Sequence, residues 1–190
     1  MAEPFERRET KSAVRGAPNP KGSGHGASHT VMTRQASNVA NTLVMAGVAI
    51  AVLWLDQFTK RLVAASFLPG ESRFVIPHFL KWTYERNVHG AFGLFGSNSV
   101  LLIAMAIVVL VLFWYSFRDA AARSMTVRVA FGMIVGGAIG NIVDRVHYGY
   151  VIDFIDFHRI WPNIFNIADS CITVGVGLLL LSSLVTRRHR

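Results

Sequence analysis

Four apolar segments with almost no charged residues divide the chain. They run from about Asn38 to Leu55, from Ser99 to Phe117, from Val127 to Val143 and from about Ile164 to Thr186. The hydrocarbon core of a bilayer requires about 20 mainly apolar residues per helix, within a range of roughly 17 to 25. The second and fourth segments meet this length directly, and the first and third meet it once their polar ends are counted. The pattern therefore predicts four membrane-spanning helices in one domain.

Glycines recur at every fourth position of the third segment, at Gly132, Gly136 and Gly140. This spacing places them on one face of a helix, where the missing side chains allow another helix to come close within the lipid. The same face would also suit a partner protein, so a non-catalytic assembly protein is one interpretation of the chain.

The connection between the first two segments, residues 60–98, mixes aromatic and β-branched residues with the breakers Pro69, Gly70 and Pro77. Such a mixture favours short strands or an element that lies at the membrane surface. We therefore expect an all-α membrane protein with four transmembrane helices and a small extracytoplasmic β-rich element over residues 61–97.

Composition supports the membrane assignment. Of the 190 residues, 52% are apolar and 16% are charged, whereas soluble domains average about 25% charged residues. The mean hydropathy is +0.41. The net charge of +8 could indicate a nucleic-acid partner, but the basic residues lie beside the apolar segments and form no basic-aromatic pattern. We expect no nucleic-acid partner.

The positions of the basic residues predict the topology. The N-terminal region, the loop over residues 118–128 and the C-terminus together carry 12 Lys and Arg, and the other two connections carry 7. Because basic residues concentrate on the cytoplasmic side, both termini should be cytoplasmic. Residues 1–37 are read as a disordered basic tail, 38–186 as the four-span domain and 187–190 as a basic end.

This topology places every acidic residue that borders a span, except Asp119, on the extracytoplasmic face. The acidic residues there are Asp56, Asp144, Asp153, Asp156 and Asp169, and the same face carries Asn141, Arg145 and Asn166. Ionisable residues at membrane depth usually mark function. Two simpler explanations remain. Asp169 could serve only to stabilise the start of a helix through the helix dipole, and Asp144 with Arg145 could be an interfacial ion pair. A proton-coupled transporter that uses Asp144, Asp153 and Asp169 as a relay is a further alternative.

The sequence contains no Cys/His cluster with metal-ligand spacing, no phosphate-binding loop and no Gly-x-Ser-x-Gly turn. The residues Asp153 and Asp169 remain as a possible carboxylate pair. Two close carboxylates cannot both ionise easily, so such a pair can activate water and protonate a leaving group. Such a pair would support aspartic-protease chemistry, and the lack of a ligand cluster predicts no metal in it.

Most of these polar residues lie in four blocks of sequence: Asp56–Lys60 (DQFTK), Gly136–Arg145 (GGAIGNIVDR), Val151–Phe157 (VIDFIDF) and Phe165–Ser170 (FNIADS). The four blocks resemble those of the lipoprotein signal peptidases, also called signal peptidase II. They occur in the family's order at the predicted span boundaries. The resemblance covers about residues 40–186.

The resemblance implies a role for each matched residue. Asp153 and Asp169 would form the catalytic dyad, supported by Asn141, Arg145 and Asn166. The same comparison makes Asp56 and Lys60 structural or substrate-positioning residues at the rim, and Asp144 the residue that orients Arg145. Members of the family act in the bacterial cytoplasmic membrane on diacylglyceryl-modified prolipoproteins, cut just before the lipidated cysteine, use no cofactor and are inhibited by globomycin. The expected partners are therefore these substrates, membrane lipid and globomycin-type inhibitors.

One block departs from the family pattern. Where the family usually has Asn-x-Gly-Ala-Ala-Phe, this chain has Asn87–Phe92 with the sequence NVHGAF. Asn87, Ala91 and Phe92 match, so Asn87 is carried over as a supporting residue. His89 and Gly90 do not match; His89 would either alter substrate contact or be a tolerated loop residue.

Overall fold

The computed structural model describes residues 24–90 and 98–188. The chain divides into two units, Met1–Ala36 and Ser37–Arg190, and the second unit contains the elements that carry the site. Helix α1 spans Gly24–Ser66. It therefore begins before Asn38. Residues 24–37, which we expected to belong to a disordered tail, are helical. Residues 1–23 of that tail lie outside the described residues.

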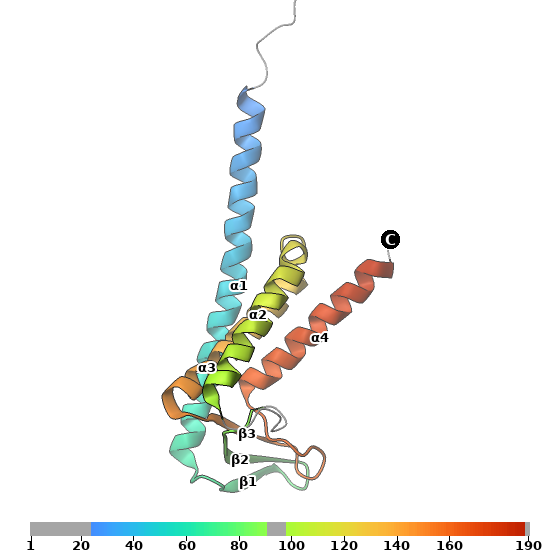
Figure 1. The fold of residues 1–190 in the computed structure, drawn as a ribbon. Helices are drawn as coiled ribbons and strands as arrows, with labels where there is room; N and C mark the ends of the chain where they lie inside the picture. Colours follow the sequence, from blue (N-terminus) through green and yellow to red (C-terminus); the bar gives the residue numbers. More distant parts are fainter. Residues whose placement is uncertain (1–23, 91–97, 189–190) are drawn as a thin grey trace, which may run out of the picture. The chain divides into compact units, whose positions relative to one another are not determined.

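The described part of the chain contains four helices that are long and apolar enough to cross a membrane. They are α1, α2 (Ser99–Ala121), α3 (Met125–Tyr148) and α4 (Ile167–Arg188) (Figure 1). Many of their large apolar side chains point away from the protein, among them Leu43, Ile50 and Val100, which are 66%, 66% and 76% exposed. Such exposure suits a lipid environment, where apolar side chains need no burial in protein. The expected four-span fold is confirmed.

The helix ends explain where the polar residues lie. The Asn98 side chain caps α2 by accepting hydrogen bonds from the backbone N–H groups of Val100 and Leu101. The C-terminal end of α3 is capped by Gly149, which adopts a φ of 79° and donates its N–H to the Arg145 carbonyl. Because α1 and α3 both continue beyond their apolar cores, Asp56 and the Asn141–Arg145 stretch lie within helices rather than at their ends.

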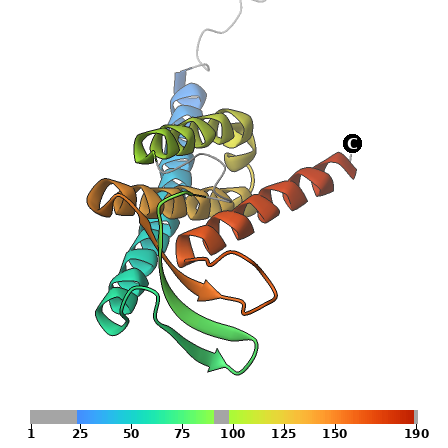
Figure 2. The ribbon, with the colours of Figure 1, turned by 60° about the horizontal axis from the view of Figure 1, so that its bottom comes forward.

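A three-stranded antiparallel sheet lies at one end of the helices (Figures 1 and 2). Strands β1 (Ser72–Ile76) and β2 (Leu80–Asn87) form the expected β-rich element, whereas residues 61–66 are helical and residues 91–97 lie outside the described part. The third strand, β3 (Val151–Asp156), pairs with β2 and comes from the connection between α3 and α4. Asp153 therefore lies in a strand of this sheet.

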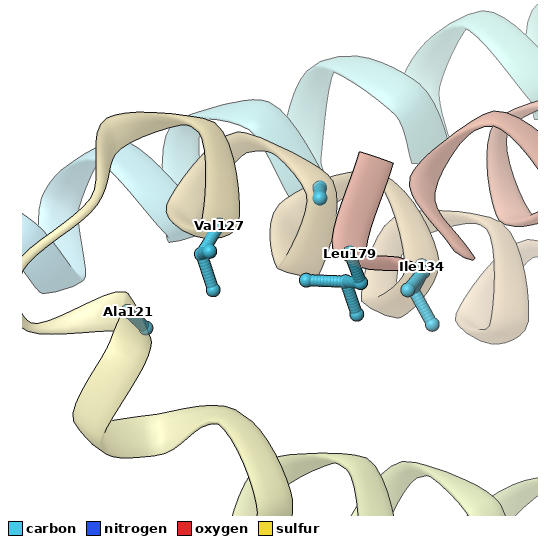
Figure 3. Packing of buried hydrophobic residues seen from close by; sticks show 5 residues of the cluster. Ala121, Val127, Ile134 and Leu179 are labelled. Atoms are coloured by element: carbon cyan, nitrogen blue, oxygen red, sulfur yellow. The ribbon is translucent and has the colours of Figure 1, made fainter. Parts of the chain in front are cut away.

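Glycines of α3 allow neighbouring backbones to approach closely. A Cβ atom added at Gly132 would lie 2.8 Å from the Met45 carbonyl oxygen of α1, and one at Gly137 would lie 2.6 Å from the Ala168 carbonyl oxygen of α4. The glycine face predicted from the sequence is therefore covered by α1 of the same chain. Beyond it, Val127, Ile134 and Leu179 belong to a buried apolar cluster between α3 and α4 (Figure 3).

Candidate active site

A cavity of about 780 Å³ contains both residues of the expected carboxylate pair. Asp153 lies in β3, opposite Glu85 of β2, and Asp169 lies in the first turn of α4. These two residues are far enough apart in sequence that only the packing of β3 against the start of α4 brings them together. The cavity is lined by residues of β2, α3, β3, α4 and the segments that join them.

Asparagine side chains hold both carboxylates. Asp153 accepts hydrogen bonds from Nδ2 of Asn87 at 2.8 Å and from Nδ2 of Asn166 at 2.6 Å. Asp169 accepts one from Nδ2 of Asn141 at 2.7 Å. Asn166 also accepts a hydrogen bond from the backbone N–H of Asp169 at 2.8 Å, as expected of a residue that caps a helix. Asn166 therefore contacts both aspartates and fixes their relative position.

The environment of Asp153 favours its protonated form. Its side chain is 1% exposed, and burial, followed by the charge of Asp169, raises the pKa of Asp153 to about 7. The hydrogen bonds from Asn87 and Asn166 oppose this effect but do not cancel it. A carboxyl group with such a pKa can hold or release a proton near neutral pH.

A buried ionic cluster lies beside the carboxylate pair. The Lys60 ammonium is 2.8 Å from a carboxylate oxygen of Asp56 and 3.0 Å from one of Asp144. Asp56 and Lys60 are 0% and 1% exposed, so the expectation that they lie at the rim was wrong. The cause is the continuation of α1 to Ser66, which places both residues within a helix that packs on α3.

The partners of Asp144 also differ from the expectation. We expected Asp144 to orient Arg145, but its carboxylate accepts hydrogen bonds from Gln57 at 2.8 Å and from the backbone N–H of Ile152 at 3.1 Å, besides pairing with Lys60. Arg145 instead donates to the Asn141 carbonyl at 3.2 Å and lines the cavity. Adjacent residues on a helix point in different directions, which separates Asp144 from Arg145.

Sequence reasoning missed Gln57. Its side-chain amide donates to Asp144 at 2.8 Å and to the Gly140 carbonyl at 3.2 Å, so it ties α1 to α3 beside the ionic cluster. The only signal was its place in the Asp56–Lys60 block. Asp156, by contrast, pairs with Lys81 at 3.0 Å and accepts a hydrogen bond from Thr83 on the sheet.

The departure from the family pattern falls on a tight turn after β2. The side-chain oxygen of Asn87 accepts hydrogen bonds from the backbone N–H groups of His89 and Gly90, at 3.1 and 3.0 Å. Gly90 has a φ of 71°, and a Cβ atom there would lie 2.9 Å from the Leu102 side chain. Glycine is therefore needed at position 90, and His89 lines the cavity. The matched residues Ala91 and Phe92 lie outside the described part.

Over residues 39–90 and 98–185, whose side chains the structure describes, no group of three or more His, Cys, Asp or Glu residues is arranged to hold a metal ion.

The fold and the site together define a class: a four-span membrane protein with two carboxylates in a cavity where the helices meet a small sheet. The family described as signal peptidase (SPase) II matches residues 48–185 of the chain. This match covers well over half of the sequence. The chain belongs to the signal peptidase II family, and its class is that of a membrane-embedded peptidase.

Known proteins of the family are similar over most of their length. The lipoprotein signal peptidase of Desulfitobacterium hafniense (strain DSM 10664 / DCB-2) is 40% identical over 142 residues, which cover 74% of this chain and 93% of that protein. The lipoprotein signal peptidase of Caldanaerobacter subterraneus subsp. tengcongensis is 44% identical over 136 residues, which cover 71% and 92%.

Solved structures are similar in fold as well. A bacterial membrane enzyme determined by the in meso method at 2.3 Å resolution superposes with a TM-score of 0.69 at 37% identity, over 75% of this chain and 88% of that one. A second, at 1.9 Å resolution, has a TM-score of 0.64 at 38% identity, over 72% and 90%. Membership of a peptidase family sets aside the transporter and assembly-protein interpretations.

Proposed function

We propose that this protein is an aspartic endopeptidase that removes signal peptides from diacylglyceryl-modified bacterial prolipoproteins, cutting just before the lipidated cysteine. The observation that carries this proposal is the placement of Asp153 and Asp169 in one cavity, bridged by Asn166. The names of the relatives support the substrate class, because they are lipoprotein signal peptidases.

The dyad would act with one carboxyl group ionised and the other protonated. The ionised group accepts a proton from a water molecule, and the water oxygen forms a bond to the scissile carbonyl carbon. The protonated group donates its proton to the carbonyl oxygen. As the tetrahedral intermediate collapses, the C–N bond breaks, the leaving amine takes a proton from one carboxyl group of the dyad, and a hydroxyl group of the intermediate gives its proton to the other carboxylate, which restores the shared proton. Near neutral pH, the raised pKa of Asp153 supports a pair that shares one proton.

The remaining residues of the site would hold this pair and its substrate. Asn87, Asn141 and Asn166 donate hydrogen bonds to the aspartates. Arg145 adds a positive charge to the cavity wall. Asp56, Lys60 and Asp144 would act behind this wall, since they are buried. Globomycin-type inhibitors would occupy the same cavity.

We further propose that the four-span domain covers residues 38–186 in the cytoplasmic membrane of a bacterium, with basic cytoplasmic ends over residues 1–37 and 187–190. The basic residues of the chain support this topology. The cavity, which lies where the sheet meets the helices, would then open near the extracytoplasmic face. Membrane lipid and the lipidated precursor would reach it from the bilayer.

The decisive experiment is a cleavage assay with purified protein and a diacylated prolipoprotein. Asp153→Asn and Asp169→Asn keep the shape of the side chain and remove its ability to titrate, so each should abolish most turnover. Because the pair acts as one unit, the double variant should be scarcely worse than either single variant.

Asp156→Asn is the matched control. Asp156 lies in the same strand as Asp153, but it pairs with Lys81 on the sheet and should leave substantial activity. Each variant is first checked for folding by its thermal transition. Cleavage by folded Asp153→Asn or Asp169→Asn at near the parent rate would show that the dyad assignment is wrong.

A further inference from the structure

The buried ammonium of Lys60 has a third partner besides its two carboxylates. It donates a hydrogen bond to the side-chain oxygen of Asn141 at 3.0 Å. An ammonium group has three donors and no acceptor. The three contacts, to Asp56, Asp144 and Asn141, therefore use all of the donors that Lys60 has. A simple structural ion pair would need only the first two.

This third contact determines the direction of the Asn141 amide. Because Lys60 can only donate, Asn141 must turn its Oδ1 toward the ammonium, which leaves its Nδ2 group 2.7 Å from the Asp169 carboxylate. The reversed amide would place its donor against the ammonium and its acceptor against the carboxylate. Both contacts would then be repulsive.

The orientation of the Asn141 amide also constrains the orientation of the Asn166 amide. Its Nδ2 group donates to Oδ1 of Asn141 at 3.1 Å and to Asp153 at 2.6 Å, while its Oδ1 accepts the backbone N–H of Asp169 at 2.8 Å. Each bond in this series agrees with the orientation that Lys60 imposes on Asn141. One buried cation is thus connected to both aspartates through two amides.

We propose that Lys60 is a positioning residue of the peptidase site: by fixing the orientation of the Asn141 amide, and through it that of Asn166, it directs an N–H donor at each aspartate of the dyad. This inference rests on the proposed function of Asp153 and Asp169. It gives the ionic cluster of Asp56, Lys60 and Asp144 a role in turnover, although none of its members lines the cavity.

N–H donors stabilise an ionised carboxylate, so their loss should change the pH at which the dyad titrates. Other charged and titratable groups lie in or beside the cavity, and their charges also act on the dyad. They are Asp56 and Lys60 of α1, Glu85, Arg86 and His89 of β2 and its following turn, and Asp144 and Arg145 of α3. A useful variant must therefore remove the Lys60 donor without changing the net charge of the cluster.

The double variant Asp56→Asn/Lys60→Met meets this condition, since it removes one positive and one negative charge. Asn at position 56 can still accept the backbone N–H of Ala168, which now donates to Asp56 at 2.9 Å. Asp144 keeps its hydrogen bonds from Gln57 and Ile152. The second variant is Asn141→Leu, which leaves the ionic cluster intact. The control is Lys81→Met/Asp156→Asn, another neutralised pair, which lies on the sheet.

Each variant is assayed for kcat and KM on a diacylated prolipoprotein between pH 5 and 9, and its thermal midpoint gives the folded fraction. Asp56→Asn/Lys60→Met and Asn141→Leu should each lower kcat by roughly tenfold to a hundredfold, as expected for a lost hydrogen bond to a charged group. KM should stay within about twofold, and both limbs of the pH profile should move to higher pH. The control should keep the profile of the parent protein.

Combining Asp56→Asn/Lys60→Met with Asn141→Leu should cost scarcely more kcat than Asn141→Leu alone, because Lys60 acts through Asn141. Losses that multiply would overturn the proposal, as would a folded Asp56→Asn/Lys60→Met variant with the parent kcat and pH profile. If that variant does not fold, a parent-like kcat and pH profile in Asn141→Leu would refute the proposal, and a lower kcat with a shifted profile would support it. Failure of the dyad itself is recognised separately, by turnover in Asp153→Asn.

Discussion

A methyl group added at Gly136 tests how closely helices α1 and α3 pack. A Cβ atom at this position would lie 2.5 Å from the carbonyl oxygen of Ala49 and 2.9 Å from its Cα atom. Ordinary contact begins at 3.4 Å, so the two backbones would have to separate by about 0.9 Å. The third obstructing atom is the Cβ of Val52, also at 2.9 Å, and because a Cβ does not move when its side chain rotates, no rotation can relieve these contacts.

The expected cost follows from two opposing effects. Overpacking of a close interface costs about 1–3 kcal/mol, whereas replacing Gly by Ala inside a helix gains about 1 kcal/mol. Gly47→Ala measures the gain alone, because a Cβ atom at Gly47 has nothing within 4 Å. Gly136→Ala should therefore be less stable than Gly47→Ala by about 1–3 kcal/mol. For a chain of this size, each kcal/mol lowers the thermal midpoint by about 2–4 °C.

Turnover should fall as well, because the same interface holds the ionic cluster. Gly140 lies one turn after Gly136 and faces a carboxylate oxygen of Asp56. A wider gap between α1 and α3 would draw Lys60 away from Asn141. The assay combines thermal unfolding in detergent, at one fixed heating rate, with cleavage of a diacylated prolipoprotein. If Gly136→Ala matches Gly47→Ala in both thermal midpoint and turnover, the close packing of α1 against α3 is refuted.

Four further predictions concern the pH dependence of activity and of stability, metal and topology. Because the pKa of Asp153 is raised to about 7, kcat/KM should fall about tenfold per pH unit above that value as the shared proton is lost; a rate that still rises at pH 9 would contradict this. The folded protein also holds the Asp153 proton more tightly than the unfolded chain does. The contribution of Asp153 to stability is therefore complete below its ordinary pKa of 3.8 and is lost as the pH rises to about 7. Thermal midpoints measured across this pH range would test this. A metal chelator should leave cleavage intact, and inhibition reversed by zinc would point to a metalloprotease. Tags at residues 1 and 190 should report the cytoplasm and a tag near Ser72 the outside; a cytoplasmic report from Ser72 would reverse the topology.

The sequence alone determined the four helices and named most of the polar residues in and beside the cavity, although it missed Gln57. Lipid imposes a length of continuous apolar residues on each span, and that requirement can be read directly from the order of residues. The spacing of Gly132, Gly136 and Gly140 was also sufficient to predict a glycine face on the third helix, because helical periodicity places these residues on one face whatever lies opposite. The resemblance to the family named Asp153 and Asp169, which the structure brings into one cavity.

Only the tertiary structure decided how these residues are connected. Residues 151–156 become a strand because they pair with β2, and such long-range pairing leaves no local pattern. The burial of Lys60 depends on α1 continuing past its apolar core and packing on α3, so a basic residue that looked like a rim residue is 1% exposed. The directions of the Asn141 and Asn166 amides follow from donors and acceptors on three separate helices and a strand, and no sequence pattern carries that information.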